Sequence, residues 1–414
     1  MAQLSDDCFA FGGALLTIDA ARAMIMAQVE PVEGVERVAL HEADGRVLAL
    51  DVAAPVDLPP FDNSAVDGYA VRLSGLEHGG CLPVSGRLAA GAPARPLAEG
   101  TAQRIFTGAA LPPDADTVFM QEDVRLDAGH VQLPPGLRQG ANTRSRGEDI
   151  ARGATALRAG LRLRPQDLAL AAALGITELT TRRAVRVALF STGDELVDPG
   201  RPTGPAQRFD SNRVLLAAMA RRTGAQVTDL GILPDRLDAI TDALREAVRG
   251  HDLILTSGGV SAGEEDHVRA AVEAVGRLVF WRLAVKPGRP VAMGVVDGVP
   301  FMGLPGNPVA AFVTFAQIAR PLIAALAGSE LQAPPMLRVR AAFVYRKKAG
   351  RREYVRVRLR PTADGIATAH KHEVDGAGIL TSLTETDGLA ELADDVTAVS
   401  EGDSVAFLPY SMLF

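Results

Sequence analysis

Between residues 183 and 328 the chain alternates short apolar runs with amphipathic segments, and this alternation constrains the fold more than any other feature. Runs typical of buried strands and segments with helical spacing follow one another at residues 184–191, 211–224, 225–232, 235–250, 252–259 and 264–276. Such alternation is typical of βαβ units, which build parallel sheets. We therefore predict a doubly wound parallel sheet, followed by a hairpin that turns at Asp297–Gly298.

The region before this sheet has a different texture. Residues 51–149 are rich in glycine and proline and carry short apolar runs between turn residues, which predicts a compact β-rich module. We expect this module to interrupt one discontinuous linker domain made of residues 1–50 and 150–182. The linker segments at 17–29 and 163–176 have helical patterns, and we expect these two helices to pack together.

The chain has 414 residues, enough for two to four domains at ~100–200 residues each. Apolar and charged residues alternate in the last region, 329–414, which predicts a half-buried β domain. The sequence thus predicts an α/β multidomain protein in which residues 183–328 form the doubly wound domain.

Composition excludes several classes of function. The formal net charge is −7, which argues against binding nucleic acid through a basic surface. The two cysteines, Cys8 and Cys81, provide neither a disulfide framework nor a CxxC zinc motif. The N-terminus does not resemble a signal peptide. The most apolar segment, 308–328, is interrupted by Arg320, so we predict a buried helix rather than a membrane span and expect a cytoplasmic protein.

Polar motifs follow each predicted strand of the parallel sheet, at the edge where open α/β sheets bind ligands. They lie at residues 191–195, 231–235 and 256–266. In the third motif, the glycines would let the amides of Gly258 and Gly259 approach a phosphate, although tight turns also use glycine for steric reasons alone. The motif is neither a Walker A loop nor a GxGxxG fingerprint, which removes the usual support for an ATPase or a Rossmann dehydrogenase.

Four carboxylates lie on three of these loops: Asp194, Glu195, Asp235 and Asp266. Carboxylates beside phosphate-binding loops favour a Mg²⁺ site, because Mg²⁺ is held by one or two carboxylates together with phosphate oxygens and water. Helix capping is the alternative for Asp266, since acids are favoured in the first turn of any helix.

Lys286 ends a predicted strand and is a candidate to offer positive charge to a phosphate or oxyanion, although a lone lysine is commonly solvated. Pro305 and Pro308 lie in a rigid turn that either shapes a pocket wall or starts a helix. No Ser-His-Asp pattern or nearby cysteine supports a protein nucleophile. The remaining interpretation is metal-assisted chemistry on a phosphorylated ligand.

The segment PPFDNSAVDGYAV, at residues 59–71, is too polar for a strand core and too specific for a generic linker. Asp62 and Asp67 lie among small residues in it, which predicts a surface loop. A domain-junction loop that happens to be acidic is the alternative.

Together these motifs resemble the MoeA family, the molybdopterin molybdenumtransferases, whose relatives include the C-terminal part of gephyrin. The resemblance covers nearly the whole chain and rests on eight motifs in order: PPFDNSAVDGYAVR, RIFTGAALP, NTRSRGEDI, ALFSTGDELV, DSNR, TSGGVSAGEEDHV, LAVKPGRP and GLPGNPVAAFVTF.

The resemblance implies an elongated, four-domain homodimer with a MogA-like third domain and a C-terminal β-barrel. It implies insertion of molybdate into adenylylated molybdopterin, with Mg²⁺ assisting and AMP leaving, in molybdenum cofactor biosynthesis. A molybdopterin adenylyltransferase and molybdoenzyme-maturation proteins would be the partners, and no nucleic acid or membrane would be involved.

The resemblance also places the active cleft between the third domain of one subunit and the second domain of the other. The catalytic residues implied are Asp67, Glu195, Asp235, Asp266 and Lys286. Glu195, Asp235 and Asp266 are implied to hold the metal. The ligand-binding residues implied are Thr107, Arg144, Asp149, Ser257, Gly258, Gly259, Ser261, Arg282, Pro305 and Pro308.

Two positions depart from some relatives. Arg282 replaces a lysine, which keeps the charge but changes its geometry, and Ala377 replaces a serine, so that a hydroxyl contact is lost. These departures leave room for a paralogue that inserts tungsten. Two further alternatives are a carrier or scaffold that holds molybdopterin without turnover, and a Mg²⁺-dependent nucleotide phosphohydrolase.

Overall fold

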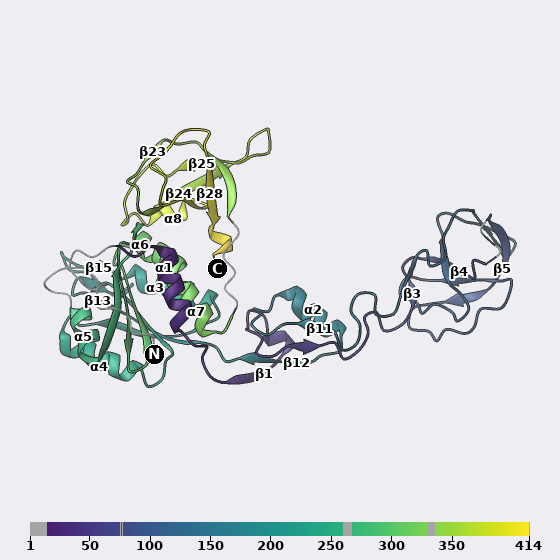
Figure 1. Ribbon diagram of the computed structural model, residues 1–414, viewed down its shortest axis with the longest axis horizontal. Coiled ribbons are helices and arrows are strands. Elements are labelled where there is room, and N and C mark those ends of the chain that lie inside the picture. The colour runs from purple at the N-terminus through teal and green to yellow at the C-terminus, as the bar shows by residue number, and fades with distance from the viewer. Residues whose placement is uncertain (1–14, 75, 77, 260–266, 330–335, 414) are drawn as a thin grey trace.

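The computed structural model describes residues 15–74, 76, 78–259, 267–329 and 336–413. The molecule is elongated (Figure 1): an α/β body and a β-barrel lie together at one end, a narrow linker leads away from them, and a small β module lies at the other end. This arrangement separates the sequence motifs into two distant groups.

The body is built on a six-stranded sheet with the strand order β16-β13-β17-β21-β20-β18. Its strands are β13 (Arg186–Thr192), β16 (Gln226–Leu233), β17 (Leu253–Ser257), β18 (Gly276–Arg282), β20 (Pro290–Val296) and β21 (Val299–Leu304). The strands β16, β13, β17 and β21 are mutually parallel, as predicted. The hairpin between β20 and β21 is confirmed, and it turns through Asp297 and Gly298 with positive φ angles of 45° and 84°.

Helices cover both faces of this sheet, so the prediction of a doubly wound fold is confirmed. Val187 and Leu189 on β13 face the core that holds α3 (Ser211–Arg222). Ala188 and Phe190, on the opposite face, belong to the core that holds the helices α4 (Leu237–Ala247) and α5 (His267–Val275). The alternation of side chains along a strand explains why a continuous apolar run serves two cores.

The apolar segment predicted as a buried helix runs from Pro308 to Leu326 as α6 (Pro308–Thr314), a π-helical turn η3 (Phe315–Ala319) and α7 (Arg320–Leu326). By length and composition it is able to cross a membrane, but 89% of its most apolar window is buried inside the protein. It is a core helix of the body.

The first helix, α1 (Ile18–Gln28), starts at the predicted cap, where the Thr17 hydroxyl accepts a hydrogen bond from the Ala20 amide. The expectation that it packs against the helix α2 (Pro165–Ala173) is wrong. Ile18 and Ile25 instead belong to the body core, because the apolar face of α1 packs directly against α7.

The linker consists of paired strands that run outward and return. The pairs are β1 (Val35–Ala39) with β12 (Glu178–Arg182), β2 (Val52–Ala53) with β11 (Thr155–Leu157), and β3 (Asn63–Ser64) with β10 (Thr143–Arg144). A short 3₁₀ turn, η2 (Leu40–Glu42), and α2 pack near the first two pairs. The two chain segments pair along the linker, as expected for a module inserted into a discontinuous region.

The module at the far end is all β, as predicted, with the strand order β7-β4-β6-β5-β9-β8. Its strands are β4 (Gly68–Val71), β5 (Gly80–Leu88), β6 (Ala102–Ile105), β7 (Thr117–Met120), β8 (Arg125–Asp127) and β9 (His130–Leu133). The prediction that residues 59–71 form a surface loop is wrong for their second half, because β4 is buried and lies between β6 and β7. A Cβ on Gly68 would lie 1.9 Å from the carbonyl oxygen of Phe119, so glycine is required there.

The C-terminal region forms the predicted β-barrel. Five strands close on themselves in the order β24-β25-β22-β28-β26-β24, and their bounds are β22 (Leu337–Ala341), β24 (Arg352–Arg360), β25 (Thr368–Lys371), β26 (Gly388–Leu392) and β28 (Ser404–Pro409). The body adds a short strand, β19 (Val285–Lys286), which pairs with β24. The remaining short elements are β14 (Leu196–Val197), β15 (Arg208–Phe209), β23 (Tyr345–Arg346), β27 (Ala398–Val399), α8 (Thr381–Thr384) and η4 (Tyr410–Met412).

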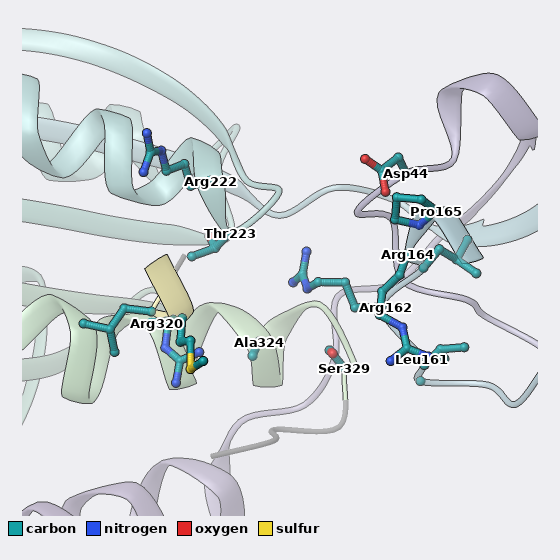
Figure 2. Close-up of a pocket in the computed structure, with 14 residues that line it drawn as sticks. Asp44, Leu161, Arg162, Arg164, Pro165, Arg222, Thr223, Arg320, Ala324 and Ser329 are labelled. Carbon is teal, nitrogen blue, oxygen red and sulfur yellow. The ribbon is translucent and has the colours of Figure 1, made fainter. Parts of the chain in front are cut away.

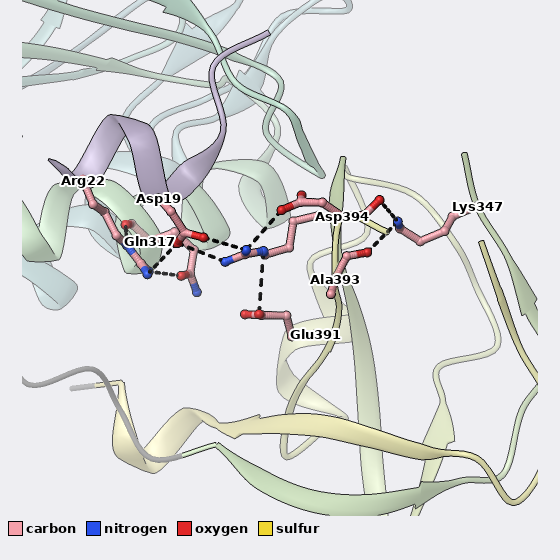
Figure 3. A network of polar contacts seen from close by, with 8 residues as sticks. Asp19, Arg22, Gln317, Lys347, Glu391, Ala393 and Asp394 are labelled. Carbon is pink, nitrogen blue, oxygen red and sulfur yellow. Dashed lines mark hydrogen bonds and ion pairs between the residues drawn. The ribbon is translucent and has the colours of Figure 1, made fainter. Parts of the chain in front are cut away.

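A polar network joins the barrel to the body (Figure 3). The Arg352 guanidinium on β24 donates to Asp19 of α1 at 2.8 Å and to Asp394 of the barrel at 3.1 Å. It also lies 3.7 Å from Glu391. In the same network, Arg22 of α1 donates to the backbone carbonyl and the side chain of Gln317 in the core helix. The barrel therefore has a defined position on the body.

Candidate active site

The four parallel strands of the body end at one edge, and the predicted polar motifs lie in the loops that follow them. Asp194 and Glu195 come after β13, Asp235 after β16, and Gly258 and Gly259 after β17. Because parallel strands present their carboxyl ends on the same side of a sheet, the fold gathers these loops, as expected from the sequence.

Two of the acids are neighbours. The Thr192 hydroxyl donates to the Asp235 carboxylate at 3.2 Å, and the Asp235 amide lies 3.5 Å from a carboxylate oxygen of Asp194. Glu195 is engaged differently, because its carboxylate forms an ion pair with Arg208 at 2.8 Å. Asp266 and Ser261 lie outside the described residues.

The carboxylates of Asp194 and Asp235 lie on neighbouring loops and have the chemistry that the predicted magnesium site requires. Among the described residues, no group of three or more His, Cys, Asp or Glu side chains is placed to hold a metal. Mg²⁺ needs only one or two carboxylates when phosphate oxygens and water supply its other ligands. The ion pair with Arg208 makes Glu195 the less suitable ligand of the described acids.

The glycine-rich turn has a steric role that limits its use for phosphate binding. Gly258 has a φ of 91°, and its amide donates to the carbonyl of Leu304 at 3.1 Å. A Cβ on Gly259 would lie 2.4 Å from a methyl carbon of Val268. The Gly258 amide is already used within the sheet edge, so the expected contact of this turn with phosphate stays a prediction.

Asn212 in the first turn of α3 ties three of these segments together, a role that the sequence reasoning missed. Its side-chain amide donates to the Ser257 hydroxyl at 2.8 Å and to the carbonyl of Gly306 at 2.8 Å. Ser257 is buried and accepts this hydrogen bond, so its hydroxyl has a structural role at the sheet edge. The sequence did carry a signal, because Asn212 lies in the DSNR motif that begins with the Asp210 helix cap.

A cavity of about 270 Å³ opens beside this edge, between the body and the barrel. The body contributes Lys286, Pro287, Gly288, Arg289, Pro290, Pro305, Asn307 and Ala310, and the barrel contributes Tyr345, Tyr354, Val355, Arg356, Asp375, Gly376 and Ala377. Two predicted residues, Lys286 and Pro305, therefore share one cavity wall. Pro308 instead occupies the first position of α6, and Arg282 ends β18; neither lines the cavity.

The Lys286 ammonium is held at the cavity by the barrel. It donates to the Tyr345 hydroxyl at 3.1 Å and lies 3.5 Å from the Glu353 carboxylate. Burial lowers the pKa of Lys286, but the Tyr345 and Glu353 contacts outweigh burial and raise it above the ordinary value. Lys286 is therefore a permanent cation at neutral pH.

Arg356 is a second cation in the wall, and the sequence reasoning missed it. It is only 7% exposed, and its guanidinium donates to the Ser382 hydroxyl at 3.0 Å and to the Gly376 carbonyl at 3.1 Å. Burial lowers the pKa of Arg356, and the attraction of Asp375 offsets this effect only in part. Its strand alternates apolar and charged residues, which gave no reason to single it out.

Ala377, the position noted as a departure, is part of the same wall. Its carbonyl accepts the Val309 amide at 3.0 Å, which ties the barrel to the start of the core helix. The alanine leaves the wall without a hydroxyl at this point.

The predicted residues of the second region lie on or beside the β module, and two of them, Asp67 and Thr107, are hydrogen-bonded to each other. The Asp67 carboxylate accepts two hydrogen bonds of 2.8 Å from the amide and the hydroxyl of Thr107. These two bonds, the backbone bond most of all, lower the pKa of Asp67. Arg144 forms an ion pair with Glu148, and Asp149 is exposed. Within one chain the Asp67–Thr107 pair lies on the module, at the far end from the Lys286 cavity (Figure 1).

Three family profiles match the chain in order. Residues 16–175 match the MoeA N-terminal region (domain I and II), residues 188–325 match a probable molybdopterin binding domain, and residues 338–410 match the MoeA C-terminal region (domain IV).

Known proteins resemble the chain over almost its whole length. A molybdopterin molybdenumtransferase of Haemophilus influenzae is 37% identical, with 96% of this chain and 100% of that protein aligned. One from a Nostoc species is 34% identical over 93% and 91% of the two chains. The crystal structure of a molybdopterin biosynthesis MoeA protein from Pyrococcus horikoshii superposes with a TM-score of 0.80 at 28% identity, covering 96% of this chain and 100% of that chain. The chain therefore belongs to the MoeA family of molybdopterin molybdenumtransferases.

Proposed function

We propose that this chain, a transferase of molybdenum cofactor biosynthesis, inserts molybdenum from molybdate into adenylylated molybdopterin with release of AMP and help from Mg²⁺. The relatives named above support the transferase and the pterin. The adenylylated substrate, Mg²⁺ and AMP release are the finer parts of this proposal.

The observation that carries the proposal is the cavity in which Lys286 and Arg356 lie beside the strand-end loops. A lysine point charge and a planar guanidinium, held by neighbouring groups before any ligand arrives, suit a tetrahedral oxyanion. Preorganised cations of this kind stabilise charge without having to reorient during the reaction. Lys286 and Arg356 would bind and orient the oxyanion, and the Pro305 turn would shape the adjoining wall.

The carboxylates of Asp194 and Asp235 would hold Mg²⁺ together with phosphate oxygens of the substrate. Mg²⁺ held there would neutralise negative charge on the phosphates and would make AMP a better leaving group. Thr192 would keep the Asp235 carboxylate in position through its hydroxyl.

We further propose that the site is completed by a second copy of the chain in a homodimer. Asp67 and Thr107 are prearranged on the module surface yet lie at the other end of the same chain from the Lys286 cavity. The partner's module would bring that pair, together with Arg144 and Asp149, to the cavity. A molybdopterin adenylyltransferase would supply the substrate to this cytoplasmic enzyme.

AMP release tests the reaction. The purified chain is incubated with adenylylated molybdopterin and Mg²⁺, with and without molybdate, and AMP is measured by chromatography. We expect AMP only when molybdate is present. AMP without molybdate would identify a phosphohydrolase, and no AMP in either case would identify a carrier; each result contradicts the proposal. A parallel series with tungstate measures the preference for the metal.

Subunit mixing tests the shared site. Asp67→Ala and Lys286→Gln chains are each expected to be inactive as homodimers, because every cleft lacks one residue. After subunit exchange, verified heterodimers contain one intact cleft and should recover up to about half of the wild-type activity per dimer, if the two clefts act independently. No recovery in verified heterodimers would refute a cleft shared between subunits.

A further inference from the structure

A second cavity, of about 380 Å³, lies where the linker, the body and the C-terminal end of the chain meet (Figure 2). Residues 160–165 of the linker form one wall. The end of α3 and the side of α7 form the other, and Met412 and Leu413 close it near the chain end.

This cavity is separate from the candidate active site. The helix α3 begins at that site, where Asn212 contacts Ser257, and it ends at the second cavity with Arg222. Ten residues of α-helix span about 15 Å, so the two ends of α3 serve different sites. The core helix likewise runs from the strand-end loops at Pro308 to the second cavity at Ala324, about 24 Å along its axis.

Four arginines line the cavity, namely Arg162, Arg164, Arg222 and Arg320, together with a single carboxylate, Asp44. Arg164 is already paired with Asp167 at 2.9 Å. The other three make no ion pair with any residue that the structure describes. The cavity therefore holds more positive charge than its own walls neutralise.

Arg162 is built into this position. One of its terminal nitrogens donates to the carbonyl of Gly45 at 2.7 Å, and Figure 2 shows the side chain extending from the linker toward α7. The same nitrogen packs against Gly224, where an added Cβ would lie 2.8 Å from it. Gly224 also has a φ of 82°, so glycine serves both the turn after α3 and the close approach of the guanidinium.

The pKa shifts of Arg162 and Arg320 agree that the described residues around them give these two cations little compensation. Burial lowers the pKa of Arg320, and the neighbouring guanidinium groups of Arg22 and Arg162 lower it further. Burial also lowers the pKa of Arg162. Gathering like charges in a partly buried space is unfavourable unless an anion neutralises them. Because a guanidinium stays charged at neutral pH, an anion bound in the cavity would compensate this positive charge.

We propose that this cavity binds a phosphate-bearing ligand with at least two negative charges, such as a diphosphate group. Guanidinium groups match phosphate oxygens with paired hydrogen bonds, and Arg162 and Arg320 line this one cavity from its two walls. Leu161, Leu163 and Met412 add apolar surface for an organic part of the ligand. The site does not depend on the proposed transferase reaction.

Inorganic diphosphate and a nucleoside diphosphate share this chemistry, so the test uses both. Sodium pyrophosphate and ADP are each titrated calorimetrically into the full-length chain in a phosphate-free buffer. Arg162→Gln and Arg320→Gln are each expected to weaken the binding of pyrophosphate by about tenfold or more, the loss of a charge-assisted hydrogen bond. Arg158→Gln is the matched control, because Arg158 is exposed on the same segment and lies outside the cavity.

The Lys286 cavity also carries cations, so each titration is repeated in Lys286→Gln. Binding that depends on Arg162 and Arg320 should persist in that background. If ADP binds more tightly than pyrophosphate, the apolar wall contacts the nucleoside. If the two bind equally, the cavity recognises the diphosphate alone. Either result supports the site.

Two outcomes would overturn the proposal. The first is wild-type protein that binds neither probe, and the second is unchanged binding in Arg162→Gln and Arg320→Gln chains whose circular dichroism and melting are normal. Should Arg162→Gln unfold because it loses the Gly45 contact, Arg222→Gln keeps the test open, since Arg222 is exposed and makes no ion pair with a described residue.

Discussion

The barrel and the β module are both small β domains, but they are attached to the body in different ways. The barrel shares its core with the body: Tyr354, Leu389 and Leu408 pack in one apolar cluster with the body helices. The two apolar clusters of the module contain residues of the module alone. Short pairs of strands are its connection to the rest of the chain.

This difference explains how the two halves of the candidate site are organised. The Lys286 cavity needs a fixed barrel, because Tyr345 and Glu353 hold the lysine across the boundary. The Asp67–Thr107 pair needs only its own module. A shared core fixes geometry within one chain, whereas a module on a narrow linker can be offered to another chain.

The largest effect on stability is expected from substitutions that leave a cavity in the core of the module or in the core shared by body and barrel. Phe119→Ala in the module should lower the free energy of unfolding by about 3–5 kcal/mol. Leu408→Ala in the shared core should lower it by about 2–5 kcal/mol. Calorimetry should show that Phe119→Ala lowers only a module transition, whereas Leu408→Ala lowers the melting of body and barrel together. A single transition that both variants shift equally would contradict the independence of the module.

Asp67→Ala should reduce the transferase rate by about 100-fold or more, in the range typical of acid–base groups. The free energy of unfolding should hardly change, because the carboxylate lies at the module surface and contacts only Thr107 and its surroundings. Activity and thermal melting are measured together. A collapse of the melting temperature would show that Asp67 maintains the fold of the module instead.

Arg352→Met tests the joint between barrel and body. The loss of the contacts with Asp19, Glu391 and Asp394 should lower the free energy of unfolding by about 2 kcal/mol. This is less than the cost of breaking a fully buried ion pair, because Asp19 is exposed and solvent screens its charge. Because the Lys286 cavity lies between the body and the barrel, loosening this joint should also weaken the proposed binding of molybdate there. Arg360→Met, an exposed change on the same strand, is the control and should alter neither quantity.

Thr107→Val should have a smaller effect, about tenfold on the rate, because the Thr107 amide still holds Asp67 after the hydroxyl is removed. The pKa of Asp67, followed by NMR, should rise toward its ordinary value. An unchanged pKa would show that the hydroxyl does not stabilise the carboxylate.

The smallest effect is expected when the binding of molybdate is measured as a function of pH between 6 and 9. The pKa of Asp67 is lowered in the folded protein. Its contribution to stability is therefore present above the unfolded pKa of 3.8 and is lost only as pH falls through the lower folded pKa. The pKa of Lys286 is raised, so its contribution is lost only as pH rises through a value above 10.5. Binding of molybdate should therefore be flat from pH 6 to 9. A titration midpoint within that range, absent in Lys286→Gln, would contradict this assignment.

Local signals explain the parts of the fold that were predicted. The Thr17 cap, the turn at Asp297–Gly298 and the βαβ alternation each depend on residues close in sequence. Contacts between distant residues explain the errors. Ile18 and Ile25 find their buried surface on the core helix rather than on α2. The motif at 59–71 misled because its second half, β4, is buried by strands that come later in the chain.

The sequence alone determined which loops carry charge and where they lie on the fold, because hydrophobic period and strand order decide which ends meet. It singled out Lys286, but not its cavity. Only the tertiary structure placed Tyr345 and Arg356 around that lysine and brought Arg162 to Arg320, since these neighbours come from segments that contact one another after the domains have packed. The charge of a residue is encoded locally; its counterion, or the lack of one, is decided by packing.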